Sequence, residues 1–410
     1  MNILNKNCRI CNNDIKPFMN FGQMPIANGF IDKIDFHNEY FYEMEVSVCQ
    51  NCNMFQLVNQ PEREKMFNES YAFFTHTSKN MIHHFKILSD KIYNNYIINK
   101  EDPFIVEIGS NDGSALKNFA EKKIKHLGVE PSKNVAEYAI NNSVNTIIDF
   151  FDKDTAKEIN KYNGKADVIF AANVMCHIPY IKSIIEGIKI LLKEDGVFIF
   201  EDPYLYDVLK NITYDQIYDE HFFLFSITSL NYLFNLFDME IIDVEHLQTH
   251  GGSMRYEVAR KNKIPINSSV KKYLLEENKI NINNQNTYKK FKKNCLLYKE
   301  KLTSLLKKLK KEGKKVSGYA ATSKSTTILN YCKLDETLID TIFDTTSIKI
   351  GKYSPGAHIP ISDHINLKYK NPDYLLLFAY NHKDEIFNKE KEFSRNGGKW
   401  ITYFPEVKII

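Results

Sequence analysis

Tyr218, Glu220 and His221 lie within four consecutive residues, in the stretch YDEHFF, and their side chains could together move a proton. A histidine can act as a general base near neutral pH, and a tyrosine can hydrogen-bond an oxygen that becomes negatively charged. That combination suits removal of a proton from a carbon next to a carbonyl group, with Glu220 orienting or tuning the base. The alternative is that His221 is a hydrogen-bonded core residue beside Phe222 and Phe223.

Three further stretches carry polar groups that could reach the same site. His177, in NVMCHIP, follows an apolar run, and Tyr71, in SYAFFTHTS, could fold over the site as a flap. The stretch HGGSMR has two glycines that allow a close backbone turn, so its polar residues could point into a cleft and bind a substrate. Those residues are His250, Ser253 and Arg255.

A cofactor site is indicated by the segment PFIVEIGSNDGSALKNFA, residues 103–120, which predicts a strand, a glycine turn and a helix. Its pattern lacks the middle glycine of the dinucleotide fingerprint and fits an S-adenosylmethionine turn better. An acid at the end of the next strand could accept hydrogen bonds from ribose hydroxyls. The predicted cofactor-binding residues are Glu107, Gly109, Asn111, Gly113, Glu130, Pro131, Ser132, Asp149, Phe150 and Asn173.

Alternating strands and helices position these residues. Apolar strands are expected at 104–108, before Glu130, before Asp149, at 167–171 and before 201, with helical patterns between them. This alternation predicts a doubly wound, parallel α/β sheet whose ligand lies at the carboxyl ends of the strands. Taken alone, the glycine turn could also be a plain strand-to-helix connection.

Two C-x-x-C pairs stand near the amino terminus, Cys8 with Cys11 and Cys49 with Cys52. This spacing allows both thiolates of a pair to bind the same tetrahedral ion. The two pairs together therefore predict one zinc site with four thiolate ligands. A site closed by four cysteines leaves no open position, and the zinc is therefore expected to be structural. Four thiols without a metal are the alternative.

A second α/β unit is expected in the carboxyl-terminal part. KVSGYAATSKSTTILNYC predicts a strand, a turn of small residues and a helix, and further strands are expected in LIDTIFDTTS, DYLLLFAYNH and KWITYFPEV. Ser323 and Lys324 at the helix start could bind the phosphates of a sugar nucleotide, although the turn could also serve packing alone. The preceding lysine-rich helices have apolar residues at helical spacing, which favours a solvated lysine face.

The bulk composition narrows the class of protein. The 410 residues include 54 basic and 51 acidic ones, a net charge of +3, so we expect no nucleic-acid partner. No apolar run reaches the roughly 18 residues of a membrane span, and the start of the chain does not resemble a signal peptide. We therefore expect a cytoplasmic protein without disulfides among its seven cysteines. The absence of an exposed apolar stripe favours a monomer.

Taken together, these stretches resemble the three-domain, zinc-containing sugar C-methyltransferases, which act on nucleotide-linked 4-keto deoxysugars. The resemblance spans almost the whole chain, through VEIGSNDG, GVEPS, NVMCHIP, YDEHFFLFS, HGGSMR, SGYAATSKSTTILNY and NGGKWITYFP. It implies methyl transfer from S-adenosylmethionine to C3 of the sugar through an enolate, with His221 as the base. It also implies that Tyr71, His177, Tyr218 and Glu220 line the site. Ala320, Phe73 and the loop FDTTSIKIGKY depart from the family pattern.

The expected organisation is a zinc-binding domain at 1–70, a Rossmann-like methyltransferase domain at 71–255 and a carboxyl-terminal Rossmann-like α/β domain at 256–410. Two other functions remain open on the sequence. One is an O- or N-methyltransferase for a small molecule, and the other is a non-catalytic zinc- and nucleotide-binding scaffold.

Overall fold

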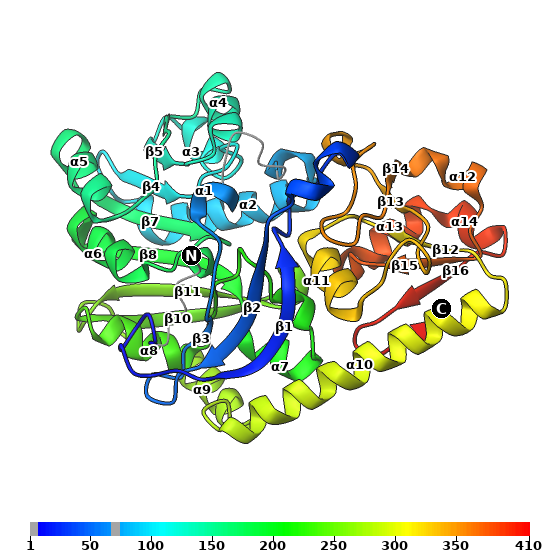
Figure 1. The fold of residues 1–410 in the computed structure, drawn as a ribbon. Coiled ribbons are helices and arrows are strands. Elements are labelled where there is room, and N and C mark those ends of the chain that lie inside the picture. Colours follow the sequence, from blue (N-terminus) through cyan, green and yellow to red (C-terminus); the bar gives the residue numbers. More distant parts are fainter. Residues whose placement is uncertain (1–6, 67–73) are drawn as a thin grey trace.

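Three sheets organise the chain, and each belongs to a different part of the sequence (Figure 1). The computed structural model describes residues 7–66 and 74–410. A four-stranded amino-terminal sheet lies across the junction between a larger middle lobe and a carboxyl-terminal lobe (Figure 1). The predicted combination of an amino-terminal domain and two α/β units is confirmed.

The amino-terminal sheet has the order β1-β2-β3-β9 and is antiparallel throughout. Its last strand comes from the middle of the chain, since β9 pairs with β3 through Phe55 and Leu224. The backbone N–H of Leu57 also donates to the carbonyl oxygen of Phe222 at 2.8 Å. The strands are β1 (Pro17–Pro25), β2 (Phe41–Val48), β3 (Phe55–Leu57) and β9 (Phe223–Leu224).

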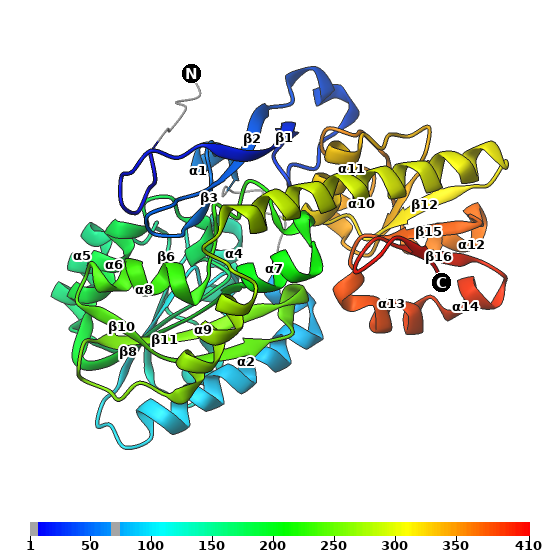
Figure 2. The ribbon, with the colours of Figure 1, turned by 90° about the horizontal axis from the view of Figure 1, so that it is seen from below.

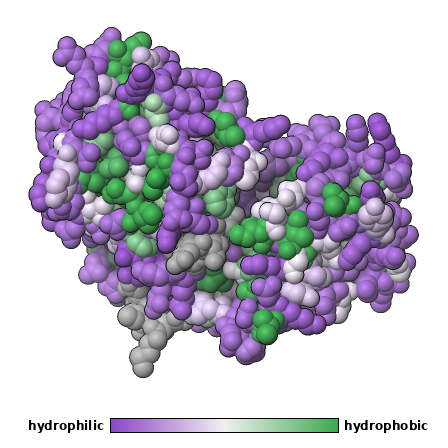
Figure 3. All heavy atoms as spheres, turned by 90° about the horizontal axis from the view of Figure 1, so that it is seen from above, coloured by the Kyte–Doolittle hydropathy of each residue, from purple (hydrophilic) through white to green (hydrophobic). Residues whose placement is uncertain are grey.

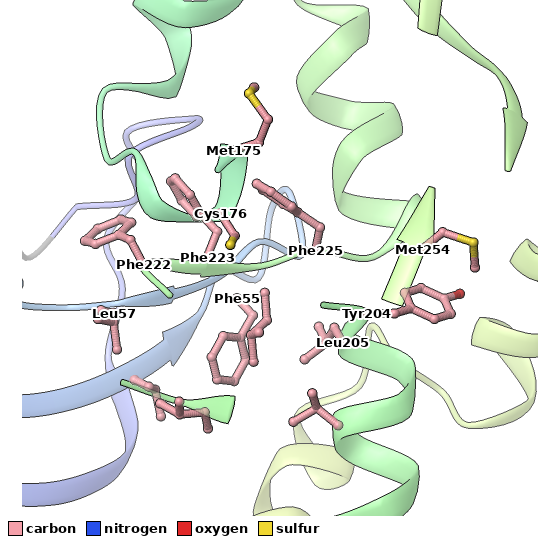
Figure 4. Close-up of a cluster of buried hydrophobic side chains, with 14 of the residues drawn as sticks. Phe55, Leu57, Met175, Cys176, Tyr204, Leu205, Phe222, Phe223, Phe225 and Met254 are labelled. Atoms are coloured by element: carbon pink, nitrogen blue, oxygen red, sulfur yellow. The ribbon is translucent and has the colours of Figure 1, made fainter. Parts of the chain in front are cut away.

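Apolar side chains pack between the amino-terminal sheet and the middle lobe. Figure 4 shows Phe55 and Leu57 of β3 among Phe222, Phe223 and Phe225 of the middle lobe, close to Cys176 and Leu205. All of these side chains are buried. The amino-terminal sheet therefore shares one hydrophobic core with the middle lobe.

The middle lobe holds a seven-stranded sheet of order β10-β11-β8-β7-β4-β5-β6. The five strands from β8 to β6 are parallel, and β11 is antiparallel to both of its neighbours. Every residue of the central strand β4 is buried, as expected for a parallel strand covered on both faces. The strands are β4 (Phe104–Ile108), β5 (Lys125–Val129), β6 (Thr146–Ile147), β7 (Ala166–Ala172), β8 (Leu192–Pro203), β10 (Met239–Leu247) and β11 (Ser253–Arg260).

Helices connect and cover this sheet, and β11 extends past the predicted domain boundary at residue 255. The strand continues to Arg260 because its pairing with β10 continues to Met239. The helices before and within the lobe are α1 (Arg63–Met66), α2 (Lys79–Ile92), α3 (Lys117–Ala120), α4 (Lys133–Asn141), α5 (Lys153–Asn163), α6 (Ile181–Leu191), α7 (Leu205–Asn211), α8 (Ile227–Asn235) and α9 (Ser268–Lys279).

The long helix α10 (Gln285–Lys311) runs from the middle lobe to the carboxyl-terminal lobe, as Figure 2 shows from below. Its buried residues, among them Phe291, Cys295, Leu302 and Leu306, recur at helical spacing, while most of its lysines are exposed. The expected solvated lysine face is thus confirmed for α10.

The carboxyl-terminal lobe has a six-stranded sheet of order β14-β13-β12-β15-β16-β17, parallel except at β17. Its strands are β12 (Val316–Tyr319), β13 (Ile342–Asp344), β14 (Ile361–Asp363), β15 (Tyr374–Leu377), β16 (Lys399–Thr402) and β17 (Lys408–Ile409). Its helices are α11 (Ser323–Cys332), α12 (Leu367–Lys370), α13 (Lys383–Lys389) and α14 (Lys391–Arg395). The predicted strand, turn and helix around residue 320 is β12 followed by α11.

Hydrophilic side chains cover most of the face seen in Figure 3, and hydrophobic ones form scattered patches on it. Among the helices in residues 7–66 and 74–410, none combines the length and apolarity needed to cross a bilayer.

Candidate active site and zinc site

The four amino-terminal cysteines come together as predicted. Their sulfur atoms all lie within 4.8 Å of one another, with Cys8 Sγ 3.5 Å from Cys52 Sγ and Cys11 Sγ 3.4 Å from Cys49 Sγ. Four thiolates around a tetrahedral zinc ion stand about 3.8 Å apart, so this donor set fits the metal.

The two cysteine knuckles have the same backbone design. The residue after each pair, Asn12 or Asn53, has a positive φ and donates its N–H to the carbonyl oxygen of Cys8 or Cys49. Asparagine tolerates this left-handed conformation, which turns the chain so that both thiols face one point. With four cysteines as its ligands, the site is closed and serves the structure.

A cavity of about 400 Å³ opens where the three parts of the chain meet. It lies at the carboxyl ends of the parallel strands of the middle sheet, the predicted position of the ligand. Most of the predicted site residues line it, namely Glu107, Gly109, Asn111, Glu130, Pro131, Phe150, Asn173, His177, Tyr218, Glu220, His221, His250, Ser323 and Lys324.

One wall of the cavity is the turn after β4. Gly109 has a φ of +67°, and a Cβ at this position would lie 2.4 Å from a methyl carbon of Val174. Glycine is therefore required both by the backbone conformation and by the close approach of the next loop. Thr75 donates its backbone N–H to Oδ1 of Asn111 at 3.1 Å, so the segment that leads into α2 contacts this turn.

Two carboxylates face this wall. Glu130 follows β5, and its oxygens accept the backbone N–H groups of Asn111 and Ser132 at 2.9 and 2.8 Å, which fixes its orientation. Burial, together with repulsion from Asp112 and Glu130, raises the pKa of Glu107 well above its ordinary value. Oε2 of Glu107 is buried without a hydrogen-bond partner.

These groups fit S-adenosylmethionine. Glu107 offers a buried acceptor for an ammonium group, Glu130 offers an oriented carboxylate for ribose hydroxyls, and Phe150 offers a ring face for the adenine. The strongest support for this fit is Oε2 of Glu107. A buried polar atom without a hydrogen-bond partner is energetically costly unless a ligand supplies one.

His221 also lines the cavity and is held by two hydrogen bonds. Its Nδ1 donates to the carbonyl oxygen of Gln216 at 2.6 Å, and its Nε2 accepts from the hydroxyl of Tyr218 at 2.7 Å. A carbonyl oxygen can only accept, so Nδ1 carries the proton and Nε2 has the lone pair. Burial lowers the pKa of His221 well below its ordinary value, and nearby His177 adds to this effect. The imidazole is therefore neutral and able to accept a proton.

Three further histidines line the cavity, and two of them, His177 and His250, are half-buried. Burial lowers the pKa of His177 to about 3 and contributes most to lowering the pKa of His250 to about 3. The rings of His177 and His221 are 5.5 Å apart and nearly parallel. Glu220 does not orient His221 as expected; the carbonyl of Gln216 and the hydroxyl of Tyr218 do so.

The carboxyl-terminal lobe supplies two lysines, of which Lys324 is buried and Lys349 is half-buried. Lys324, at the start of α11, donates to the carbonyl oxygen of His250 at 2.8 Å, and Lys349 donates to that of Ala321 at 2.8 Å. Burial lowers the pKa of both ammonium groups. Sequence reasoning missed Lys349, since it lies in a loop with no spacing pattern and reaches the cavity only through the fold.

Five predicted site residues do not line the cavity, and Tyr71 lies outside the described residues. The five are Gly113, Ser132, Asp149, Ser253 and Arg255. Gly113 and Ser132 act on the cofactor side without lining the cavity. A Cβ on Gly113 would lie 3.1 Å from Val144, and the backbone N–H of Ser132 donates to Glu130 and orients it.

Arg255 has a different role from the one expected. Its guanidinium is buried and lies 2.6 Å from Glu201 on β8 and 2.6 Å from Glu245 on β10. Ser253, on the same strand, donates to the carbonyl oxygen of Thr249 at 3.1 Å. Because β11 is inserted between β8 and β10, Arg255 links three neighbouring strands, whereas Ser253 holds the turn that precedes β11.

The fold and the cavity define a methyltransferase that uses S-adenosylmethionine. A family model for the C-methyltransferase C-terminal domain matches residues 248–405, one for a methyltransferase domain matches residues 81–244, and one for a zinc binding domain matches residues 8–67. The chain is 32% identical to C-methyltransferase NovU of Streptomyces niveus over 406 residues, which cover 98% of this chain and 96% of NovU. It belongs to the family of zinc-containing, S-adenosylmethionine-dependent C-methyltransferases.

Solved structures of other methyltransferases are similar to part of the chain. One is an S-adenosylmethionine-dependent methyltransferase from Anabaena variabilis, with a TM-score of 0.34, 16% identity, and coverage of 43% of this chain and 85% of that one. Another is the magnesium protoporphyrin IX methyltransferase of Synechocystis, with a TM-score of 0.35, 12% identity, and coverage of 44% and 83%.

Because the chain belongs to the C-methyltransferase family described above, the alternative function of a non-catalytic scaffold is excluded.

Replacing Cys49 and Cys52 together by serine should remove the zinc and lower the unfolding temperature. Two ligands cannot hold the ion, and the sheet that carries it shares a core with the middle lobe. Zinc content by elemental analysis and thermal unfolding check this. A Cys295→Ala variant, which removes a buried thiol outside the cluster, should retain the metal. Full zinc content in the double variant would contradict the assignment.

Gly109→Ala should weaken binding of S-adenosylmethionine by at least about tenfold, because the added Cβ strains the turn and displaces Val174. Isothermal titration calorimetry measures the effect. Gly164→Ala is the matched control, since Gly164 has a φ of +80° but no atom would lie within 4 Å of its Cβ. Equal affinities in the two variants would show that this turn does not hold the cofactor.

Proposed function

We propose that this enzyme transfers a methyl group to C3 of a nucleotide-linked 4-keto deoxysugar through an enolate, with His221 as the base. The observation that supports the proposal most strongly is the imidazole of His221, which carries its proton on Nδ1 and lines the same cavity as Gly109 and Glu130. NovU, the relative described above, is itself a C-methyltransferase.

Bound S-adenosylmethionine supplies a methyl group that is electrophilic because it is attached to a positively charged sulfur. The part of this chain is to make the acceptor carbon nucleophilic. The hydroxyl of Tyr218 first turns from Nε2 of His221 to the ketone oxygen, which frees the lone pair of Nε2. Nε2 then takes the proton from the carbon next to the ketone, and the electron pair of that C–H bond moves into the enolate. The imidazolium keeps its hydrogen bond to the carbonyl of Gln216, an interaction that favours the charged form.

The developing oxygen charge of the enolate needs donors. The hydroxyl of Tyr218 is 2.7 Å from Nε2 of His221, so it reaches the place where proton transfer occurs. His177 lies on the same wall and offers a second donor. Preorganised donors of this kind act strongly in a cavity shielded from water. In the same proposal, Tyr71 and Glu220 complete the acceptor site.

The nucleotide part of the substrate is assigned to the carboxyl-terminal wall. Lys324, Lys349, Ser323 and Thr346 line the cavity there, and α11 begins at Ser323. Two ammonium groups and the start of a helix suit the negative charges of a diphosphate.

An O- or N-methyltransferase remains the alternative within the enzyme class, and it would need no enolate. The reducing conditions required by a four-thiolate zinc site support a cytoplasmic location, which we propose together with a monomeric state.

His221→Ala should slow solvent deuterium exchange at the acceptor carbon by about 10²- to 10⁴-fold, because the general base is lost. Affinity for S-adenosylmethionine should stay within about twofold, since the hydrogen bonds of His221 go to Gln216 and Tyr218 and not to Glu130. Nuclear magnetic resonance of the substrate and calorimetry measure the two quantities. Exchange at the rate of the unmodified enzyme would rule out His221 as the base, and an unmodified enzyme that methylates without exchange would favour the O- or N-methyltransferase.

Lys349→Met should weaken binding of a nucleoside diphosphate by about 10- to 100-fold, the effect of losing one charged hydrogen-bond donor. Methionine retains much of the buried chain over Phe30, which Lys349 contacts at 5.0 Å. Thymidine diphosphate titrated into the zinc-loaded protein is the measurement. Lys370→Met removes a lysine that donates to Thr341 instead, and it should bind normally. Unchanged affinity in Lys349→Met would place the diphosphate elsewhere.

A further inference from the structure

The turn between β1 and the short helix at 33–38 belongs to the zinc-bearing domain, yet it reaches the active-site cavity. Within it, the N–H of Gly29 donates to the carbonyl oxygen of Ile26 and that of Phe30 donates to the carbonyl oxygen of Asn28, both at 3.0 Å. Ala27 is buried and Asn28 lines the cavity. The turn is thus a compact unit with one polar side chain presented to the active site.

Two consecutive residues of this turn hold two consecutive acids of the middle lobe. The backbone N–H of Ala27 donates to Oδ1 of Asp219 at 3.0 Å, and Nδ2 of Asn28 donates to Oε1 of Glu220 at 2.5 Å. Both acids are buried, and Glu220 precedes His221 directly. Burial and the neighbouring Glu220 raise the pKa of Asp219 well above its ordinary value.

Adjacent buried carboxyl groups repel each other when both are ionised, so their positions depend on the donors that face them. Ala27 provides a backbone donor, which any residue would supply. Asn28 provides a side-chain donor, which leucine or alanine would not. A carboxylate only accepts hydrogen bonds, so the NH₂ group of Asn28 must face Glu220.

The turn is itself held firmly by the third domain. The hydroxyl of Thr326 on α11 donates to the carbonyl oxygen of Ala27 at 2.8 Å. Farther along the chain, Glu39 accepts the N–H of Gly356 at 2.8 Å and lies 2.7 Å from Nε2 of His358. Asn28 is therefore fixed against the carboxyl-terminal lobe before it contacts Glu220.

We propose that Asn28 is a positioning residue for the methyl-transfer reaction, which holds the carboxylate of Glu220 in the cavity where the acceptor binds. The zinc-bearing domain then contributes directly to the acceptor site. This inference rests on the proposed function only in its assumption that the acceptor meets Glu220, whichever compound the acceptor is.

The first test needs no acceptor. A crystal structure of the zinc-loaded Asn28→Ala variant should show the carboxylate of Glu220 displaced, with His221 and the fold retained. Glu39→Gln is the matched control, because it weakens docking of the same domain at a site away from the cavity and should leave Glu220 in place. A Glu220 carboxylate that keeps its position in Asn28→Ala overturns the proposal, even if no keto sugar is ever methylated.

The second test is a double-mutant cycle with the acceptor that the enzyme methylates. Asn28→Ala should lower kcat/KM for the acceptor by about 10- to 100-fold and leave affinity for S-adenosylmethionine unchanged. In a Glu220→Ala background, followed by single-turnover transfer of radioactive methyl, the same substitution should cost less than about twofold. An equal loss in both backgrounds, or an equal loss in Glu39→Gln, would assign the effect to general destabilisation and overturn the proposal.

Discussion

A polar group removed from water needs a hydrogen-bond partner, and this constraint shapes the junction of the three domains. The cavity between them is lined by histidines, acids and lysines, and some of the polar groups at the junction have partners across a domain boundary. Lys324 of the carboxyl-terminal lobe donates to His250 of the middle lobe, and Ala27 of the amino-terminal domain bonds to both lobes. The hydroxyl of Thr327 likewise donates to the carbonyl oxygen of Ile217 at 2.9 Å. Hydrogen bonds between the domains therefore add to those within each lobe in fixing the cavity.

The cavity formed in this way has an acidic side and a basic side. Glu107 and Glu130 line the side formed by the parallel sheet, and Lys324 and Lys349 line the side formed by the carboxyl-terminal lobe. His177 and His221 also line the cavity, and burial keeps both imidazoles neutral. A cofactor that carries an ammonium group and a sulfonium group suits the acidic side. The neutral imidazoles add no charge of their own to the cavity.

The local patterns predicted well what depends on neighbours in the sequence. The Gly109 turn, the paired cysteines and the strand-to-helix turn before Ser323 all have the expected form, because each is fixed within a few residues. The stretch HGGSMR predicted a close backbone turn, and Gly251 and Gly252 both have a positive φ. It could not reveal that β11 is inserted between β8 and β10, where Glu201 and Glu245 surround the guanidinium of Arg255.

Long-range contacts account for what was missed. Asn28 and Lys349 carry no spacing pattern, and each reaches the cavity only because another domain is docked beside it. Ala320 shows the reverse case, since the sequence marks it as a departure from a family glycine and the structure gives it a φ of +72°. The backbone there keeps the conformation that glycine adopts easily, although the residue has changed.

The pairing of β3 with β9 has a consequence for synthesis on the ribosome. Residue 57 emerges 167 residues before Leu224, which completes the same sheet. At roughly 5–20 residues per second, the nascent amino-terminal sheet waits about 8–30 s with one edge unpaired. Zinc bound during that interval would fix the two cysteine knuckles early. The edge of β3 would then remain unpaired, and chaperones could cover it until Leu224 is made.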